Sequence, residues 1–147
     1  MANVSKASTT WRGNLVNGSG TTTAVSSGRF TDLPVSWAAR TEAHGGKTSP
    51  EELVAAVHAS CFAMALSAGL ARAGLTATQL DVTASVTFDK VGDAWTVVSS
   101  DIEVKGVVPG TDQAAFAAAA EGTKEGCPIS RALKGNVKLG VKATLAF

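Results

Sequence analysis

Two cysteines are the residues of this chain whose type allows the most chemistry. Cys61 and Cys127 are its only cysteines, and they do not form a C-x-x-C pair. A thiolate is a nucleophile that can be oxidised to a sulfenic acid and then to a disulfide. A free cysteine is also a common small core residue, so the count of cysteines alone favours a structural interpretation over a functional one.

Cys61 lies on an apolar side of an expected helix. Four apolar residues share that side at helical spacing: Leu53, Val57, Met64 and Ala65. Burial among apolar side chains raises the pKa of a thiol and makes it unreactive, so a nucleophilic Cys61 requires a cation supplied by another segment. By itself, this neighbourhood favours a packed residue.

Cys127 stands directly before Pro128, at the expected start of a short helix over residues 128–134. Unpaired N–H groups and the helix dipole stabilise a thiolate at such a position. Cysteine is not among the preferred N-cap residues, so its presence here is suggestive. A functional and an accidental cysteine remain equally compatible with this position.

The other candidate groups give weaker signals. His58 lies one turn before Cys61 and is placed to act as a base, although a histidine near an apolar helix face is more often packed. His44, in a glycine-rich loop, is expected to be solvated. His58 and Cys61 offer only two metal ligands, and the sequence has no phosphate loop or dinucleotide fingerprint, so no metal or cofactor is expected.

The composition predicts one globular domain over residues 1–147. Hydrophobic residues make up 45% and charged residues 17%, and the formal net charge of +1 gives no basic surface for nucleic acid or anionic lipid. The apolar runs are expected to be too short to span a membrane, and the polar start has no signal-peptide core. The sequence therefore predicts a cytosolic protein.

Antiparallel strands are expected in the first third of the chain. Residues 9–16 and 20–25 flank Asn17-Gly18, the strongest short hairpin signal. A third extended segment is expected over 35–40, and a loop over 41–48.

A long helix is expected to carry Cys61. Ser49 is a good N-cap, Pro50 suits the first helical position, and Glu52 completes a capping box. The helix over 50–73 ends before Gly74 and has apolar residues on several faces, so it is expected to be largely buried.

The second half of the chain is expected to add more sheet and two helices. Alternating apolar residues predict strands over 81–88, 95–105 and 137–147, with a turn at Gly92-Asp93 between the first two. The helices are expected over 112–124 and 128–134. This order indicates an α+β fold with a largely antiparallel sheet.

Each cysteine also belongs to a recognisable motif. Residues 49–62 read SPEELVAAVHASCF, and residues 126–130 read GCPIS. Both segments resemble the cysteine motifs of the OsmC/Ohr family of osmotically inducible and organic-hydroperoxide-resistance proteins. The resemblance runs from Trp11 to the last strand. It implies an α+β fold with antiparallel sheets wrapped around a long buried central helix, in an intertwined homodimer.

The resemblance also points to an active-site arginine. The chain is more similar to the OsmC branch, whose arginine position matches Arg40 in residues 37–42 (WAARTE). Arg29 is the competitor, because the Ohr branch takes an arginine from an earlier segment. Glu51 is implied to hold the guanidinium in a bidentate pair.

A thiol-dependent peroxidase mechanism is what the resemblance implies. Cys61 attacks a hydroperoxide and becomes a sulfenic acid, with Arg40 supplying the cation. Cys127 condenses with it to a disulfide, which an external dithiol reduces, a lipoyl-bearing protein being one candidate. An apolar pocket suits organic hydroperoxides better than hydrogen peroxide. The competing interpretation is a non-catalytic thiol-based stress sensor or binding protein on the same fold.

Helix geometry favours active sites shared between two chains. Glu51 and Cys61 are ten residues apart, which is about 15 Å along a helix axis at 1.5 Å per residue. An Arg–Glu pair at the start of the helix is therefore too far away to act on Cys61 of the same helix. Two such helices packed antiparallel about a two-fold axis would place Glu51 of one chain beside Cys61 of the other. The resemblance implies the same homodimer.

Overall fold

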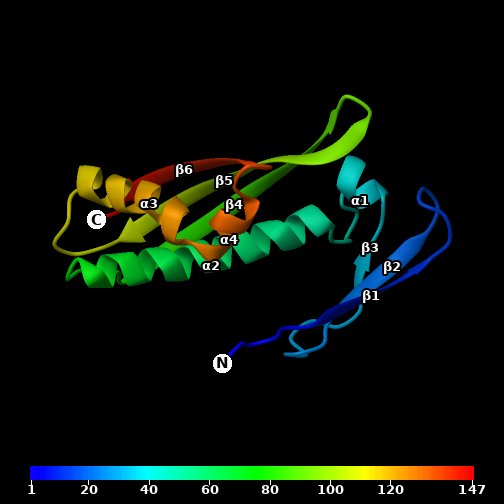
Figure 1. The fold of residues 1–147 in the computed structure, drawn as a ribbon, viewed down its shortest axis with the longest axis horizontal. Helices are drawn as coiled ribbons and strands as arrows, with labels where there is room; N and C mark the ends of the chain where they lie inside the picture. Colours follow the sequence, from blue (N-terminus) through cyan, green and yellow to red (C-terminus); the bar gives the residue numbers. More distant parts are fainter. The chain divides into compact units, whose positions relative to one another are not determined.

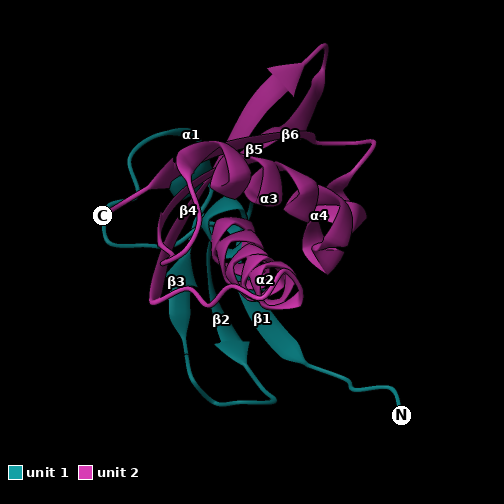
Figure 2. Ribbon diagram, turned by 90° about the vertical axis from the view of Figure 1, so that its left-hand side faces the viewer, with its two compact units in different colours: residues 1–53 teal, residues 54–147 magenta.

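The computed structural model describes residues 1–147 and divides into two compact units (Figure 1, Figure 2). Unit 1 comprises residues 1–53 and unit 2 comprises residues 54–147. Each unit has its own three-stranded sheet. The single domain over 1–147 stays a prediction.

The sheet of unit 1 is the expected antiparallel hairpin with a short third strand. Its strands are β1 (Ala7–Arg12), β2 (Ser19–Ala24) and β3 (Leu33–Val35), in the order β1-β2-β3. The expected two-residue turn is wrong, because the strands pair from Arg12 with Ser19 and a six-residue loop joins them. A Cβ at Gly18 would meet the Trp11 ring at 2.8 Å, so glycine is needed there for close packing rather than for a tight turn.

Residues 35–40 differ from the extended segment expected from the sequence. The strand ends at Val35, and α1 (Ala38–Thr41) follows as one helical turn. The Ala39 N–H donates to Ser36 Oγ at 3.2 Å, which stabilises the start of this turn. Arg40 therefore lies on a helix rather than on a strand.

The long helix α2 (Pro50–Arg72) begins and ends within one residue of the prediction. Ser49 is its N-cap, because the Glu52 N–H donates to Ser49 Oγ at 3.1 Å. The Glu52 carboxylate accepts a hydrogen bond from the Thr48 hydroxyl at 2.5 Å. The start of α2 is thus fixed by side chains on both sides of the cap.

In unit 2 the sheet is mixed, although the pairings of the two sheets are antiparallel in all cases but one, as expected. The strands β4 (Gln79–Val91) and β5 (Ala94–Val107) form the predicted hairpin, joined at Gly92-Asp93. The last strand β6 (Lys138–Leu145) pairs with β5 in parallel. Parallel pairing requires a crossover connection, which α3 (Gln113–Gly126) and α4 (Pro128–Leu133) supply.

The core of unit 2 lies between one face of this sheet and the helices α2 and α3. The apolar face of β4 is the one predicted, since its residues alternate between partly buried and exposed. The buried core cluster contains Phe62, Leu66, Leu70, Ile102, Val104, Val108, Phe116, Ala120, Cys127 and Leu145. The sheet and both helices therefore fix the positions of the two cysteines.

The expectation of a largely buried central helix is wrong for one chain by itself. The face of α2 that packs on the core is made by His58, Phe62, Leu66 and Leu70 at four-residue spacing. Val57 and Met64, from the stripe expected around Cys61, are 47% and 67% exposed. The core of unit 2 therefore covers only one face of α2 and leaves a second apolar face open.

Candidate active site

The two cysteines of unit 2 lie side by side, although 66 residues separate them. The Cys61 Sγ on α2 is 3.3 Å from the Cys127 Sγ at the start of α4. Both thiols are free in the structure. This separation is short enough for a disulfide to form with a small movement of either side chain.

The Cys127 sulfur sits at the predicted helix cap. Its side chain accepts a hydrogen bond from the Ser130 N–H at 3.5 Å, and the residue is fully buried. Burial opposes ionisation of Cys127, but the Ser130 N–H and side chain, the neighbouring Cys61 and the Ile129 N–H outweigh it and lower the pKa of Cys127. The local backbone thus favours a thiolate at this position.

Cys61 has the opposite tendency. Burial raises the pKa of Cys61, and the neighbouring Cys127 raises it further, although the Ile129 N–H acts in the other direction. None of these causes is a cation. The structure therefore agrees with the sequence argument that a reactive Cys61 needs a positive charge from another segment.

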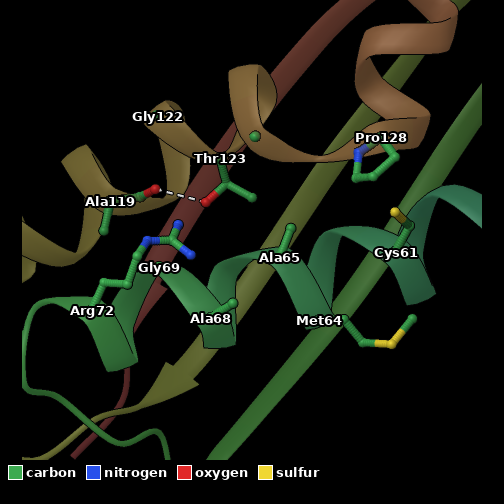
Figure 3. Close-up of a pocket in the computed structure, with 11 residues that line it drawn as sticks. Cys61, Met64, Ala65, Ala68, Gly69, Arg72, Ala119, Gly122, Thr123 and Pro128 are labelled. Atoms are coloured by element: carbon green, nitrogen blue, oxygen red, sulfur yellow. Dashed lines mark hydrogen bonds between the residues drawn. The ribbon is translucent and has the colours of Figure 1, made fainter.

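Access distinguishes the two thiols more clearly than acidity. Cys61 is partly exposed and lines a cavity of about 520 Å³, whereas Cys127 is fully buried. Figure 3 shows this cavity between α2 and the segment from α3 to α4, with Cys61 near Pro128 and Arg72 farther along α2. A small molecule in the cavity meets the sulfur of Cys61.

The cavity is lined mainly by small and apolar groups. Arg72 is its one charged lining residue. The other lining residues are Cys61, Met64, Ala65, Ala68, Gly69, Ala119, Gly122, Thr123, Gly126 and Pro128. Such a lining suits an apolar molecule, with a cation available at one place.

In unit 1, the structure brings together Arg40 and Glu51. Arg40 Nη2 lies 2.7 Å from Glu51 Oε1, and Arg40 Nε is 3.2 Å from each carboxylate oxygen. The guanidinium also lies over the Trp37 ring, 5.5 Å from its centroid. Glu51 is buried, while Arg29, the competing arginine, is exposed. The bidentate pair expected from the sequence is present.

His58 in unit 2 contacts two serines that the sequence did not single out, Ser100 and Ser130. His58 is packed, as the cautious interpretation held, but both its ring nitrogens are hydrogen-bonded: Nδ1 to Ser100 Oγ at 2.6 Å and Nε2 to Ser130 Oγ at 2.8 Å. Ser130 stands within the GCPIS motif, which gave a signal for it. Nothing in the local sequence of Ser100, 42 residues after His58, indicates this contact.

The remaining candidates are unremarkable in the structure. His44 is exposed, as expected. No group of three or more His, Cys, Asp or Glu side chains lies close enough together to hold a metal ion.

Comparison with known proteins identifies the family. The model of OsmC-like proteins matches residues 43–142, which include both cysteines, Glu51 and the cavity lining. The chain belongs to the OsmC-like family. It is 39% identical over 129 residues to peroxiredoxin OsmC of Escherichia coli K12, covering 88% of this chain and 89% of the relative.

Other OsmC/Ohr proteins are also similar. An organic hydroperoxide resistance protein of Xanthomonas axonopodis pv. citri is 32% identical over 125 residues, or 84% of each chain. The crystal structure of OhrB of Bacillus subtilis matches 95% of this chain and 98% of its own with a TM-score of 0.71 at 23% identity. The identity to OsmC exceeds that to this Ohr protein, in agreement with the predicted branch.

Family membership also bears on helix α2. With a mean hydropathy of 1.8 in its most apolar window, this 23-residue helix is long and apolar enough to cross a membrane, contrary to the expectation from the sequence. One face of α2 forms part of the core of unit 2, and this face carries His58 with both nitrogens hydrogen-bonded. We therefore interpret α2 as the core helix of a soluble protein.

Proposed function

We propose that this protein is a thiol-dependent peroxidase that reduces organic hydroperoxides in stress defence. The observation that carries the proposal is the pair of sulfurs 3.3 Å apart, of which Cys61 borders a cavity and Cys127 does not. The names of its relatives, peroxiredoxin OsmC and organic hydroperoxide resistance protein, support the same activity.

The reaction divides between the two cysteines. The Cys61 thiolate attacks the terminal peroxide oxygen, the O–O bond breaks, and the alkoxide leaves as an alcohol after taking a proton, with Cys61 as a sulfenic acid. Cys127 then attacks the Cys61 sulfur, an S–S bond forms, and the sulfenic hydroxyl leaves as water with the Cys127 proton. An external dithiol reduces the disulfide by exchange.

The cavity supports an organic rather than an inorganic peroxide as the preferred substrate. Small and apolar groups border Cys61 on α2 and across the cavity on α3. They gain contacts with an alkyl or aryl group but gain little from hydrogen peroxide. Hydrogen peroxide is therefore the poorer substrate.

Arg40 and Glu51 complete the site in this proposal. The guanidinium supplies the positive charge that Cys61 lacks, and the buried Glu51 carboxylate holds it in a fixed orientation. Glu51 and Cys61 are ten residues apart on the continuous helix α2, which corresponds to about 15 Å along its axis. Arg40 and Glu51 of one chain therefore serve Cys61 of a second chain.

A homodimer with shared active sites follows, and the open face of α2 supports it. Val57 and Met64 are seven residues apart, so they lie on one helix face, and both are largely exposed in a single chain. Apolar side chains on a core helix are normally covered. Two copies of α2 packed about a two-fold axis would cover this face and bring each charged pair to the partner's thiol.

The same proposal includes a location and a reductant. A disulfide that must be reduced in every cycle suits the cytosol, where dithiol reductants are maintained. The reductant is a dithiol, and a lipoyl-bearing protein is the candidate.

The activity is tested by following hydroperoxide consumption with cumene hydroperoxide and a dithiol. The wild-type protein should turn over repeatedly. Cys61→Ser should be inactive, whereas Cys127→Ser should react once and give a sulfenic acid that a dimedone reagent traps. Multiple turnovers by Cys61→Ser would contradict the assignment. A wild-type protein that oxidises without turnover would favour the stress sensor.

A further inference from the structure

The proposed reaction leaves one buried titratable side chain without a role. His58 is 1% exposed and lies one helical turn before Cys61 on α2. Its two ring nitrogens bond Ser100 on β5 and Ser130 on α4, and both serines are fully buried. Three elements that are distant in sequence therefore meet at this ring, and one of them carries Cys127 at its cap.

Ser130 connects this ring to the resolving sulfur. Burial lowers the pKa of His58, so the ring is neutral at neutral pH, with one donor and one acceptor nitrogen. Its Nε2 bonds Ser130 Oγ at 2.8 Å, and the Ser130 backbone N–H donates to Cys127 Sγ at 3.5 Å. The ring therefore holds the residue whose N–H points at the sulfur.

The second ring nitrogen completes the series. Nδ1 bonds Ser100 Oγ on β5 at 2.6 Å, which fixes the orientation of the ring against the sheet. The contacts thus run from Ser100 through His58 and Ser130 to Cys127. The groups facing the Cys127 sulfur are Ser130, the Ile129 N–H and Cys61, and no charged side chain contributes.

We propose that His58 is a positioning residue for the resolving step, holding Ser130 so that its backbone N–H stabilises the Cys127 sulfur as a nucleophile toward oxidised Cys61. The inference rests on the proposed peroxidase function and assigns Ser100 the part of fixing the orientation of the ring. His58 does not itself remove the thiol proton, because a buried imidazolium without a carboxylate partner is costly. Its role is confined to the second step, in which the S–S bond forms and water leaves.

Single-turnover kinetics separate this step from the first. One equivalent of cumene hydroperoxide is mixed with the reduced protein, and sulfenic acid and disulfide are followed over time by quenching and mass spectrometry. Ser130→Ala, His58→Phe and Ser100→Ala should leave the rate of Cys61 oxidation within about twofold. Disulfide formation should slow by about three- to tenfold, because a lower thiolate fraction is partly offset by a more nucleophilic thiolate.

A second readout reports the state of Cys127 without any peroxide. In a Cys61→Ser background, thiolate absorbance measured against pH gives the pH at which half of Cys127 is ionised. Ser130→Ala and His58→Phe should raise it by up to about one pH unit, because each releases the residue whose N–H donates to the charged sulfur. Ser100→Ala should raise this midpoint less. Added to His58→Phe it should cause no further rise, because Ser100 acts only through the ring.

Controls distinguish positioning from loss of stability. Phe116→Leu alters a fully buried core residue outside the hydrogen-bonded series, so it should lower stability without slowing disulfide formation. His58→Gln, which retains a donor toward Ser130, should recover part of the rate lost in His58→Phe. Disulfide formation at the wild-type rate in Ser100→Ala and Ser130→Ala would overturn the inference. Absence of Cys61 oxidation in the wild-type protein would instead contradict the proposed function.

Discussion

The two units of this chain hold different groups of the proposed active site. Unit 1 has a guanidinium and a buried carboxylate 2.7 Å apart, with no thiol among its residues. Unit 2 has two thiols 3.3 Å apart, and the one beside the cavity has its pKa raised by burial, with no cation to lower it. In the proposed mechanism neither half is a competent peroxidase site alone, since one lacks a nucleophile and the other lacks the charge that activates it.

The comparison also separates two ways of tuning a thiol. Cys127 is stabilised as a thiolate by neutral donors of its own unit, chiefly Ser130. Cys61 has the backbone N–H of Ile129 as its one favourable contact, and burial outweighs it. In the proposed mechanism, fixed local donors suit the thiol that reacts only inside the protein, and the thiol that meets the substrate depends on a cation from another segment.

Removal of the cation is expected to have the largest effect on the first step. Arg40→Ala should raise the pKa of Cys61 by about one to three pH units, the usual range for one close charge partner. The rate of Cys61 oxidation at neutral pH should fall tenfold or more. Alkylation rate against pH in a Cys127→Ser background measures the pKa directly. Arg29→Ala is the matched control, and an effect of Arg29→Ala in place of Arg40→Ala would make Arg29 the active-site arginine.

Substrate selectivity tests the cavity beside Cys61. Cumene hydroperoxide should have a higher kcat/KM than hydrogen peroxide by roughly tenfold to two-hundredfold, corresponding to about 1–3 kcal/mol of apolar contact in the transition state. Steady-state kinetics on both peroxides decide the matter. Equal values would mean that the cavity does not bind the organic group.

Arg72 sharpens the selectivity argument, because it is the charged residue of the cavity lining. Arg72→Gln should lower kcat/KM for a fatty-acid hydroperoxide by about two- to fivefold, the amount expected for one exposed ion pair. The value for cumene hydroperoxide, which has no carboxylate, should stay unchanged. A loss that is equal for both substrates would show that Arg72 shapes the cavity and does not select an anionic group.

The pH dependence of stability should report the buried histidine of unit 2. The pKa of His58 is lowered by burial from 6.5, so the unfolded chain binds a proton at higher pH than the folded one. The free energy of unfolding should therefore decrease as pH falls below about 6.5 and level off once the folded state is also protonated. Denaturant titrations of the wild-type protein and His58→Gln check this. If the free energies of unfolding of the two proteins changed with pH in parallel, His58 would not be neutral in the folded state.

Local signals were sufficient for much of this molecule. Ser49, Pro50 and Glu52 predicted where α2 begins, and Cys127 before Pro128 predicted a helix cap that accepts a backbone hydrogen bond. These features depend on residues a few positions apart. The family motifs added the pairing of Arg40 with Glu51, which the structure contains.

The differences arise where distant residues decide the outcome. The direction of β6 depends on the crossover through α3 and α4, and alternation within a strand carries no information about direction. The bonds of His58 to Ser100 and Ser130 span 42 and 72 residues. The apolar stripe around Cys61 was assigned to the core because periodicity shows that a face is apolar but not which partner covers it.

Mixed dimers test the central claim most directly, provided that Glu51→Ala alone is nearly inactive. A Cys61→Ser chain paired with a Glu51→Ala chain should have about half the wild-type activity, because Cys61 of one chain and Glu51 of the other form one complete site. The reciprocal pair, a wild-type chain with a Cys61→Ser/Glu51→Ala chain, should be nearly inactive. Activity in the reciprocal pair and none in the first would place each site within one chain and contradict the account.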